Sequence, residues 1–157
     1  MKKVLLITVI CLITISIGIL CYIKFFKGEK EVIEEVNDTE VVDSIKIIIE
    51  DKELVVKLEN NSTTKALIEK LNDNNLTIEA KEYGGFEKVG QLGFKLPRRD
   101  KYTQTKVGDV MLYNGDEITI FYDTNTWNYT KIGSIDISKE ELMEILGDGD
   151  IIYTIAK

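Results

Sequence analysis

The alternation of apolar and polar residues predicts a β-hairpin soon after residue 44. Residues 45–50 and 53–59 are both rich in β-branched side chains, which favour strands. The polar pair Asp51-Lys52 joins them, and a two-residue connection of this kind is typical of a hairpin. We therefore expect the two segments to pair as antiparallel strands.

The same alternation predicts a second hairpin from residues 108–113 and 117–122. Asn114-Gly115 lies between these segments and favours a type I′ turn, because both residues tolerate positive φ. Successive side chains of a strand point to opposite faces. In the second arm this places Ile120 and Phe121 on opposite faces of the sheet.

Two short helices are predicted between the strands. Asn60-Asn61-Ser62 offers capping side chains before residues 63–71, whose apolar positions fall on one helical face. Ser138 and Glu141 form a capping box at the start of a second helix, which we expect to end at Gly147. Further strands are predicted at residues 76–81, 131–137 and 151–155.

A glycine-rich stretch, residues 83–97, lies in the middle of the domain. We interpret it as a long connection, because its glycines permit positive φ and close backbone approach. A connection of this length inside a compact domain is more often functional than idle. Many short strands and two short helices together predict a mainly β fold, a β-barrel with helical plugs.

An apolar run near the N-terminus predicts a membrane anchor. Val4 to Ile23 contains no charged side chain and is flanked by lysines on both sides. At about 1.5 Å rise per residue, a helix of this length crosses a hydrocarbon core of roughly 30 Å. We therefore predict one N-terminal transmembrane helix, with residues 1–27 as an uncleaved signal-anchor.

Two alternatives stay open for this segment, a cleaved secretory signal and a bacterial lipoprotein lipidated at Cys21. The run exceeds the roughly 7–15 apolar residues of a cleaved signal and lacks a small-residue cleavage site. Large side chains also stand directly before Cys21. The lysine count is nearly balanced across the run, but the short N-terminal tail favours a domain outside the cytoplasm. We expect a single-pass protein of the cell membrane.

Charge divides the remaining chain into a linker and a folded domain. Residues 28–43 hold seven acidic side chains and one basic side chain, so repulsion favours an extended acidic linker. A short amphipathic helix is the alternative for this segment. The domain then occupies residues 44–157, which is enough for one core. Both cysteines, Cys11 and Cys21, precede it, so the domain has no disulfide.

Net charge excludes one class of partner. Four of the 20 basic residues precede residue 28 and all 27 acidic residues follow it. The part beyond the predicted anchor therefore has 16 basic and 27 acidic side chains, a net charge of −11. Nucleic-acid binding needs a basic face that neutralises phosphates, so we expect no nucleic-acid partner.

The absence of histidine limits the available chemistry. It removes the usual general base near neutral pH and the commonest nitrogen ligand of metals. We predict no metal site and no cofactor. Asp148 and Asp150 are interpreted as part of a helix stop and turn rather than as calcium ligands. Glu82 and Glu87 are interpreted as a solvated pair rather than as an acid–base pair.

Several segments together resemble the cyclophilin-like domain family of small bacterial proteins. The resemblance covers about residues 45–156 and depends on Glu82-Tyr83-Gly84-Gly85-Phe86-Glu87-Lys88, Gly90-Gln91-Leu92-Gly93, Leu96-Pro97, Gly108-Asp109-Val110-Met111-Leu112-Tyr113, Ile118-Thr119-Ile120-Phe121-Tyr122 and Ile132-Gly133. It implies a closed barrel of about eight strands with a helix at each end. This fold agrees with the interpretation of the residues themselves.

The resemblance implies no agreed activity. True cyclophilins are peptidyl-prolyl isomerases that use an arginine, a histidine, a glutamine and an apolar proline pocket. This chain has no histidine, and Arg98 and Arg99 follow Pro97 rather than standing in the arginine–Phe–Met–x–Gln arrangement of the enzymes. Gln91 lies in a glycine loop of another pattern. We predict no catalytic residue. Whether the protein is an enzyme is left open, and the sequence favours a protein without catalysis.

Aromatic residues around the glycine-rich stretch are the best ligand-binding candidates, since a rigid ring with a polar edge suits a groove. The candidate residues are Tyr83, Phe86, Gln91, Phe94, Arg98 and Trp127. The first functional hypothesis is a membrane-tethered binding module for an extended peptide or small ligand, without catalysis. The alternatives are a divergent prolyl isomerase acting on exported proteins and a spacer or assembly domain without a ligand.

Overall fold

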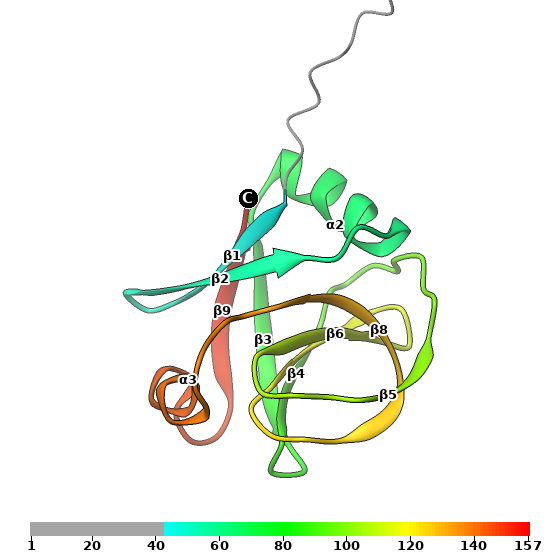
Figure 1. Ribbon diagram of the computed structural model, residues 1–157. Helices are drawn as coiled ribbons and strands as arrows, with labels where there is room; N and C mark the ends of the chain where they lie inside the picture. The colour runs from blue at the N-terminus through cyan, green and yellow to red at the C-terminus, as the bar shows by residue number, and fades with distance from the viewer. Residues whose placement is uncertain (1–42) are drawn as a thin grey trace, which may run out of the picture. The chain divides into compact units, whose positions relative to one another are not determined.

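The computed structural model describes residues 43–157, and its strands close into a barrel (Figure 1). The elements are β1 (Ser44–Ile49), β2 (Lys52–Leu58), α2 (Ser62–Asp73), β3 (Leu76–Tyr83), β4 (Glu87–Gln91), β5 (Lys101–Gln104), β6 (Asp109–Tyr113), β7 (Glu117–Phe121), β8 (Thr126–Ser134), α3 (Lys139–Leu146) and β9 (Ile151–Ala156). The predicted mainly β barrel of about eight strands with two helices is confirmed.

Eight antiparallel strands form the ring in the order β2-β1-β9-β3-β4-β7-β6-β8. The ring closes where the end of β2 pairs with the end of β8, Lys57 with Ser134 and Leu58 with Gly133. A Cβ atom at Gly133 would lie 2.3 Å from the carbonyl oxygen of Lys57, so glycine permits this close approach. β5 lies outside the ring and pairs with the first half of β8.

The interior of the barrel holds the main hydrophobic core. Ile120 of β7 and Ile47 of β1 are fully buried there, with Leu67 from α2 and Leu142 from α3. Side-chain alternation on β7 puts Phe121 on the other face, as the sequence predicted. This outer face holds a second, smaller cluster of Met111, Phe121 and Tyr129, against which Phe86 and Tyr113 pack.

Both predicted hairpins form, but their connections differ from the prediction. The first connection is Glu50–Asp51 rather than Asp51-Lys52, because Lys52 pairs with Ile49 and Glu50 takes the positive φ of 52°. In the second hairpin Tyr113 pairs with Glu117, which leaves a three-residue loop instead of a two-residue type I′ turn.

The glycine-rich stretch is not one long connection, and this interpretation was wrong. Its middle forms β4, which pairs with β3 on one side and β7 on the other. Gly84 and Gly85 have φ values of 63° and 74°, so they form a tight turn between β3 and β4. The predicted strand at 131–137 is also shifted, since β8 starts at Thr126 and pairs there with the unpredicted β5.

The helix starts follow the capping residues in the sequence. Asn61 caps α2 in a reciprocal capping box with Thr64. Ser138 accepts a hydrogen bond from the backbone nitrogen of Glu141 at 3.2 Å, and α3 ends at Gly147 with a φ of 61°. The predicted N-terminal helix lies outside the described residues. Within residues 43–157, neither helix combines the length and apolarity that crossing a membrane requires.

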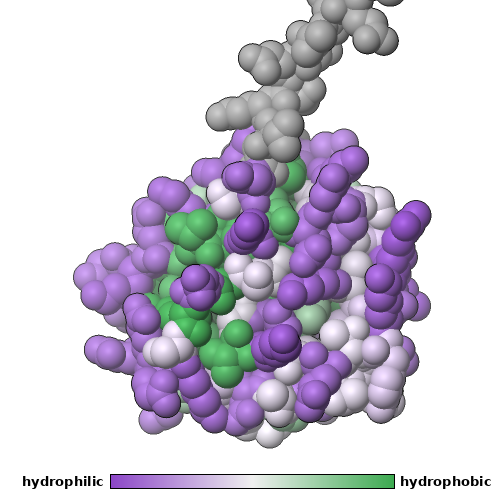
Figure 2. Space-filling model, viewed as in Figure 1, coloured by the Kyte–Doolittle hydropathy of each residue, from purple (hydrophilic) through white to green (hydrophobic). Residues whose placement is uncertain are grey.

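One face of the domain is mostly polar with an apolar area over β1, β2 and β9 (Figure 2). Val55 and Ile152 are more than half exposed in the folded domain. These strands fill the core with their inner faces, and they are not the strands that carry the second cluster.

Candidate functional site

A pocket of about 440 Å³ lies over the second cluster on the outer wall of the barrel. It is lined by Tyr83, Phe86, Glu87, Val89, Tyr113, Glu117, Asn125, Trp127 and Tyr129. These residues come from the end of β3, the following turn, β4, β6, β7, the loop before β8 and β8 itself. A pocket of this size accepts a small molecule or one side chain of a peptide.

Stacked and edge-to-face contacts hold the aromatic walls in place. The rings of Tyr83 and Phe86 are edge to face at 5.9 Å, and Phe86 stacks on buried Phe121 at 6.3 Å. Tyr113 and Tyr129 meet at 5.9 Å on the other side. Phe86, Tyr113 and Tyr129 are therefore fixed by packing before any ligand arrives.

Two aromatic side chains form the outer edge of the pocket. Tyr83 is 60 % exposed and Trp127 is 52 % exposed, the largest exposures among the lining residues. Trp127 lies on the first half of β8, where β5 pairs with that strand. Large exposed rings beside a cavity are available for contact with a ligand.

Glu87 brings a carboxyl group to these aromatic walls. It is only 5 % exposed, and its Oε2 atom is buried without a hydrogen-bond partner. Burial raises its pKa from 4.5 to about 7, and the charges of Glu117 and Glu82 act in the same direction. The Thr119 hydroxyl, which is itself buried without a hydrogen-bond partner, lies near enough to the carboxyl group to oppose this rise. A buried polar atom without a partner is costly, so its position calls for an explanation.

The other polar lining groups are already oriented by neighbours. Glu117 Oε1 accepts a hydrogen bond of 2.7 Å from Gln91 Nε2. Asn125 Nδ2 donates to the Tyr129 hydroxyl oxygen at 2.9 Å. Burial, together with the charge of Glu87, raises the pKa of Tyr129 to about 12, so this phenol is neutral at physiological pH.

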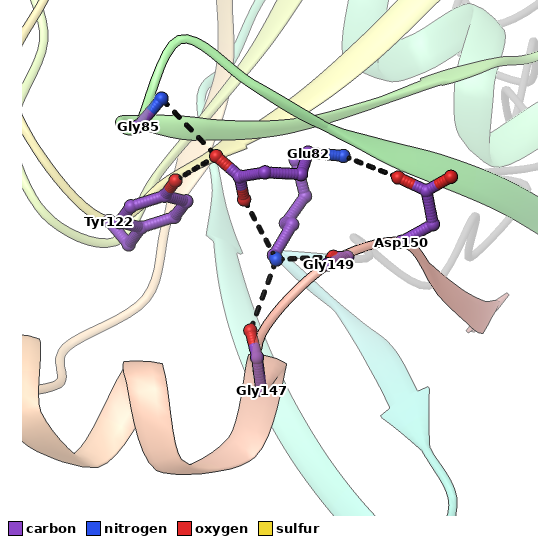
Figure 3. Close-up of polar contacts among 7 residues, drawn as sticks. Glu82, Gly85, Tyr122, Gly147, Gly149 and Asp150 are labelled. Carbon is purple, nitrogen blue, oxygen red and sulfur yellow. Dashed lines mark hydrogen bonds and ion pairs between the residues drawn. The ribbon is translucent and has the colours of Figure 1, made fainter.

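An ion pair between buried Lys88 and partly exposed Glu82 fixes β4 on the inner side of the wall. Lys88 follows Glu87 and points the opposite way, where its side chain is fully buried. Its Nζ atom lies 2.8 Å from Glu82 Oε2 and donates to the carbonyl oxygens of Gly147 and Gly149 at 3.1 and 2.5 Å (Figure 3). The ammonium group therefore joins β3, β4 and the loop after α3.

Glu82 extends this network to the turn beneath the pocket. It also accepts hydrogen bonds from the Tyr122 hydroxyl and from the backbone nitrogen of Gly85 (Figure 3). Burial tends to raise the pKa of Glu82, but the hydrogen bonds from Lys88 and Tyr122 outweigh it and keep that pKa below its usual range. An ionised Glu82 thus holds the turn that presents Tyr83 and Phe86.

The structure brings three of the six candidate residues together. Tyr83, Phe86 and Trp127 line the pocket. Gln91 lies beside it and reaches it only through Glu117. Phe94 packs against the main core with Lys70 over its ring, and Arg98 pairs with Asp100 at 3.4 Å. Gln91, Phe94 and Arg98 are not lining residues.

Sequence reasoning missed Glu87, and its interpretation as half of a solvated pair was wrong. Glu87 is buried on the outer face of β4, whereas Glu82 binds Lys88 on the inner side. Recognising β4 would have separated them, since the alternation then puts Glu87 and Lys88 on opposite faces. Among residues 43–157, no three acidic side chains are grouped closely enough to hold a metal ion.

The fold and pocket define a closed antiparallel barrel with an aromatic site on its outer wall. The chain belongs to the Cyclophilin-like family, whose profile matches residues 47–156. It is similar to the solution structure of the hypothetical protein AF2241 from Archaeoglobus fulgidus, with a TM-score of 0.52 and 16 % identity over 72 % of this chain and 92 % of that chain. That likeness shows the fold alone. No curated protein matches the chain.

Proposed function

We propose that the protein is a membrane-tethered cyclophilin-like binding module. The anchor is the apolar run before residue 28, the acidic linker spans residues 28–43, and the domain lies outside the cytoplasm. Its ligand, an extended peptide or a small molecule, occupies the aromatic pocket on the outer barrel wall. The observation that carries this proposal is a cavity of about 440 Å³ bounded by five aromatic rings and the buried Glu87 carboxyl group.

Binding explains this arrangement better than packing does. If these side chains only stabilised the fold, we would expect their aromatic rings to be buried. We would also expect no carboxyl oxygen to be left without a hydrogen-bond partner. Here Tyr83 and Trp127 stay more than half exposed, and Glu87 Oε2 lacks a partner. Pockets that combine apolar walls with a few converging polar groups and a perturbed pKa are the usual binding sites of proteins.

The prolyl isomerase alternative needs a donor beside the apolar surface that favours the twisted amide. Gln91 and Arg98 were the donors that the sequence offered, and neither lines the pocket. The two donors that the sequence offered therefore do not support this alternative. A prolyl-isomerisation assay on the full chain tests it: turnover above background that disappears in Phe86→Ala would reinstate the enzyme.

A ligand-observed NMR screen of the full chain against small molecules and short peptides tests the binding proposal. Any compound that binds wild type should lose contact in Trp127→Ala, which removes an exposed wall of the pocket. Tyr102→Ala is the matched control, because Tyr102 is 73 % exposed on β5 and is not a lining residue. A library without hits, or hits unaffected by Trp127→Ala, would contradict the proposed site.

A further inference from the structure

The chemistry of the pocket specifies which ligand it takes, if the proposed binding function holds. We infer that the aromatic pocket binds an organic cation, an ammonium group carried by a small molecule or by a lysine side chain. The inference depends on three features of the lining: the aromatic rings, the two carboxylates and the absence of a basic side chain among the lining residues.

The aromatic rings supply attraction for a cation. Five of the nine lining residues are aromatic, and they come from both sides of the cavity. The face of an aromatic ring is negative, so a cation is attracted to each ring face that it contacts. The edge-to-face contacts of Tyr83 with Phe86 and of Tyr113 with Tyr129 leave ring faces in different orientations, as a roughly spherical ammonium group requires.

The carboxyl groups supply the counter-charge. Glu87 Oε2 is a buried atom of this wall without a hydrogen-bond partner, as is Thr119 Oγ1, and a cation in the pocket would offset the negative charge of the Glu87 carboxylate. Glu117 adds a second carboxylate, which Gln91 already orients by a hydrogen bond of 2.7 Å. The nearest buried cation, Lys88, lies on the opposite face of β4 and is bound to Glu82. It is therefore not available to neutralise Glu87.

Other ligand classes fit less well. An anion would meet two carboxylates and no basic lining residue. A metal ion needs several oxygen ligands, and the described residues hold no group of three acidic side chains that could coordinate one. A wholly apolar ligand would cover the Glu87 carboxylate without supplying any compensating charge.

The test uses the only tryptophan of the chain, Trp127, as a reporter because it lines the pocket. The full chain, held in an uncharged maltoside detergent, is titrated with choline while tryptophan fluorescence is followed. The control ligand is 3,3-dimethylbutan-1-ol, which has the shape of choline without its charge. Choline should bind at least about tenfold more tightly than this alcohol, a difference of about 1.4 kcal/mol.

Two further ligands distinguish the sources of the ammonium group. A blocked lysine dipeptide represents a protein side chain, and n-butylamine represents a free primary amine. Tighter binding of the dipeptide than of both free cations supports a peptide ligand. Tighter binding of choline or n-butylamine supports a small molecule. Both results support recognition of an organic cation, since both need the same rings and carboxylates.

Variants test which groups recognise the cation. Glu87→Gln keeps the shape of the side chain and should weaken binding of the preferred cation at least tenfold, with little effect on the alcohol. Tyr83→Ala removes a ring from the outer edge and should weaken the cation several-fold. Glu144→Gln, on the exposed surface of α3, and Tyr102→Ala should leave both affinities unchanged.

Affinity for the cation should also depend on pH. The ionisable lining groups around Glu87 are Glu117 from β7, Tyr83 from β3, Tyr113 from β6 and Tyr129 from β8, and Glu82 of β3 acts on it by its charge. None of these is basic. Because Glu87 has a pKa of about 7 before binding, it is more often neutral at pH 6 than at pH 8. Choline should therefore bind several-fold more weakly at pH 6, and Glu87→Gln should remove most of this dependence.

The outcomes separate this inference from the binding proposal. If choline and the alcohol bind equally, or if Glu87→Gln leaves choline affinity unchanged, the cation inference is wrong. The pocket would still be a binding site in that case, provided that the NMR screen finds uncharged ligands sensitive to Trp127→Ala. If neither the cations nor the screened compounds bind, both proposals are wrong.

Discussion

Glu87 places an ionisable group among aromatic rings, and its protonation therefore couples stability to pH. Its pKa is about 7 in the folded chain, against 4.5 for an ordinary glutamate. Between these two values the folded state keeps a proton that the unfolded state has released. By linkage, this contribution to stability is greatest at low pH, falls as pH rises from about 4.5 to 7, and stays low above that.

Replacing Glu87 by glutamine tests this residue-scale effect. Glu87→Gln should have nearly the stability of wild type at pH 4.5 and should be more stable at pH 8, by on the order of 1–3 kcal/mol. Urea unfolding at several pH values measures the difference, and Glu144→Gln should show no such trend. A variant less stable than wild type at pH 8 would show that the carboxylate is better accommodated than its burial indicates.

At the scale of elements, the β3–β4 hairpin owes its position to a buried lysine. Lys88 links Glu82 to two carbonyl oxygens of the loop after α3, and the adjoining turn presents Tyr83 and Phe86 to the pocket. Local sequence did not reveal this hairpin, because glycines at positions 84, 85, 90 and 93 obscured the alternation of β4. Pairing with β3 and β7 compensates for the weak strand propensity of glycine.

Lys88→Met should destabilise the domain by about 1–3 kcal/mol, because it leaves the Glu82 carboxylate and the carbonyl oxygens of Gly147 and Gly149 without their donor. The exposed Lys81 on β3 offers the matched control, and Lys81→Met should change the free energy of unfolding by less than about 0.5 kcal/mol. Denaturant unfolding measures both variants. Equal stability of Lys88→Met and wild type would mean that the Lys88–Glu82 ion pair gives no net stabilisation.

At the scale of the whole molecule, the proposal joins a barrel to a membrane anchor. The full chain should sediment with membranes and resist extraction by alkaline carbonate, whereas a chain without residues 1–27 should be released. Added protease should degrade the domain from the outer side of intact cells whose wall has been removed. A full chain recovered in the soluble fraction, or a domain protected until lysis, would contradict the anchor or its orientation.

The sequence by itself determined the features that depend on neighbouring residues. Strand alternation predicted the β1–β2 and β6–β7 hairpins and the opposite faces of Ile120 and Phe121, and the capping side chains predicted the starts of α2 and α3. These features follow from contacts within a few residues, so short windows of sequence contain them. The composition also shows that the chain lacks histidine, and this absence restricts the available chemistry whatever the fold.

Only the tertiary structure decided which residues share the pocket. Glu87 and Trp127 are far apart in the chain, and they line one cavity because β4, β7, β6 and β8 follow one another around the barrel. Alternation tells which face of a strand a residue occupies, but not which strands become its neighbours. The order of strands in the closed barrel decides which strands are neighbours. As a result, Gln91, Phe94 and Arg98 lie outside the pocket lining, whereas the carboxyl group of Glu87, which the sequence did not predict, is part of it.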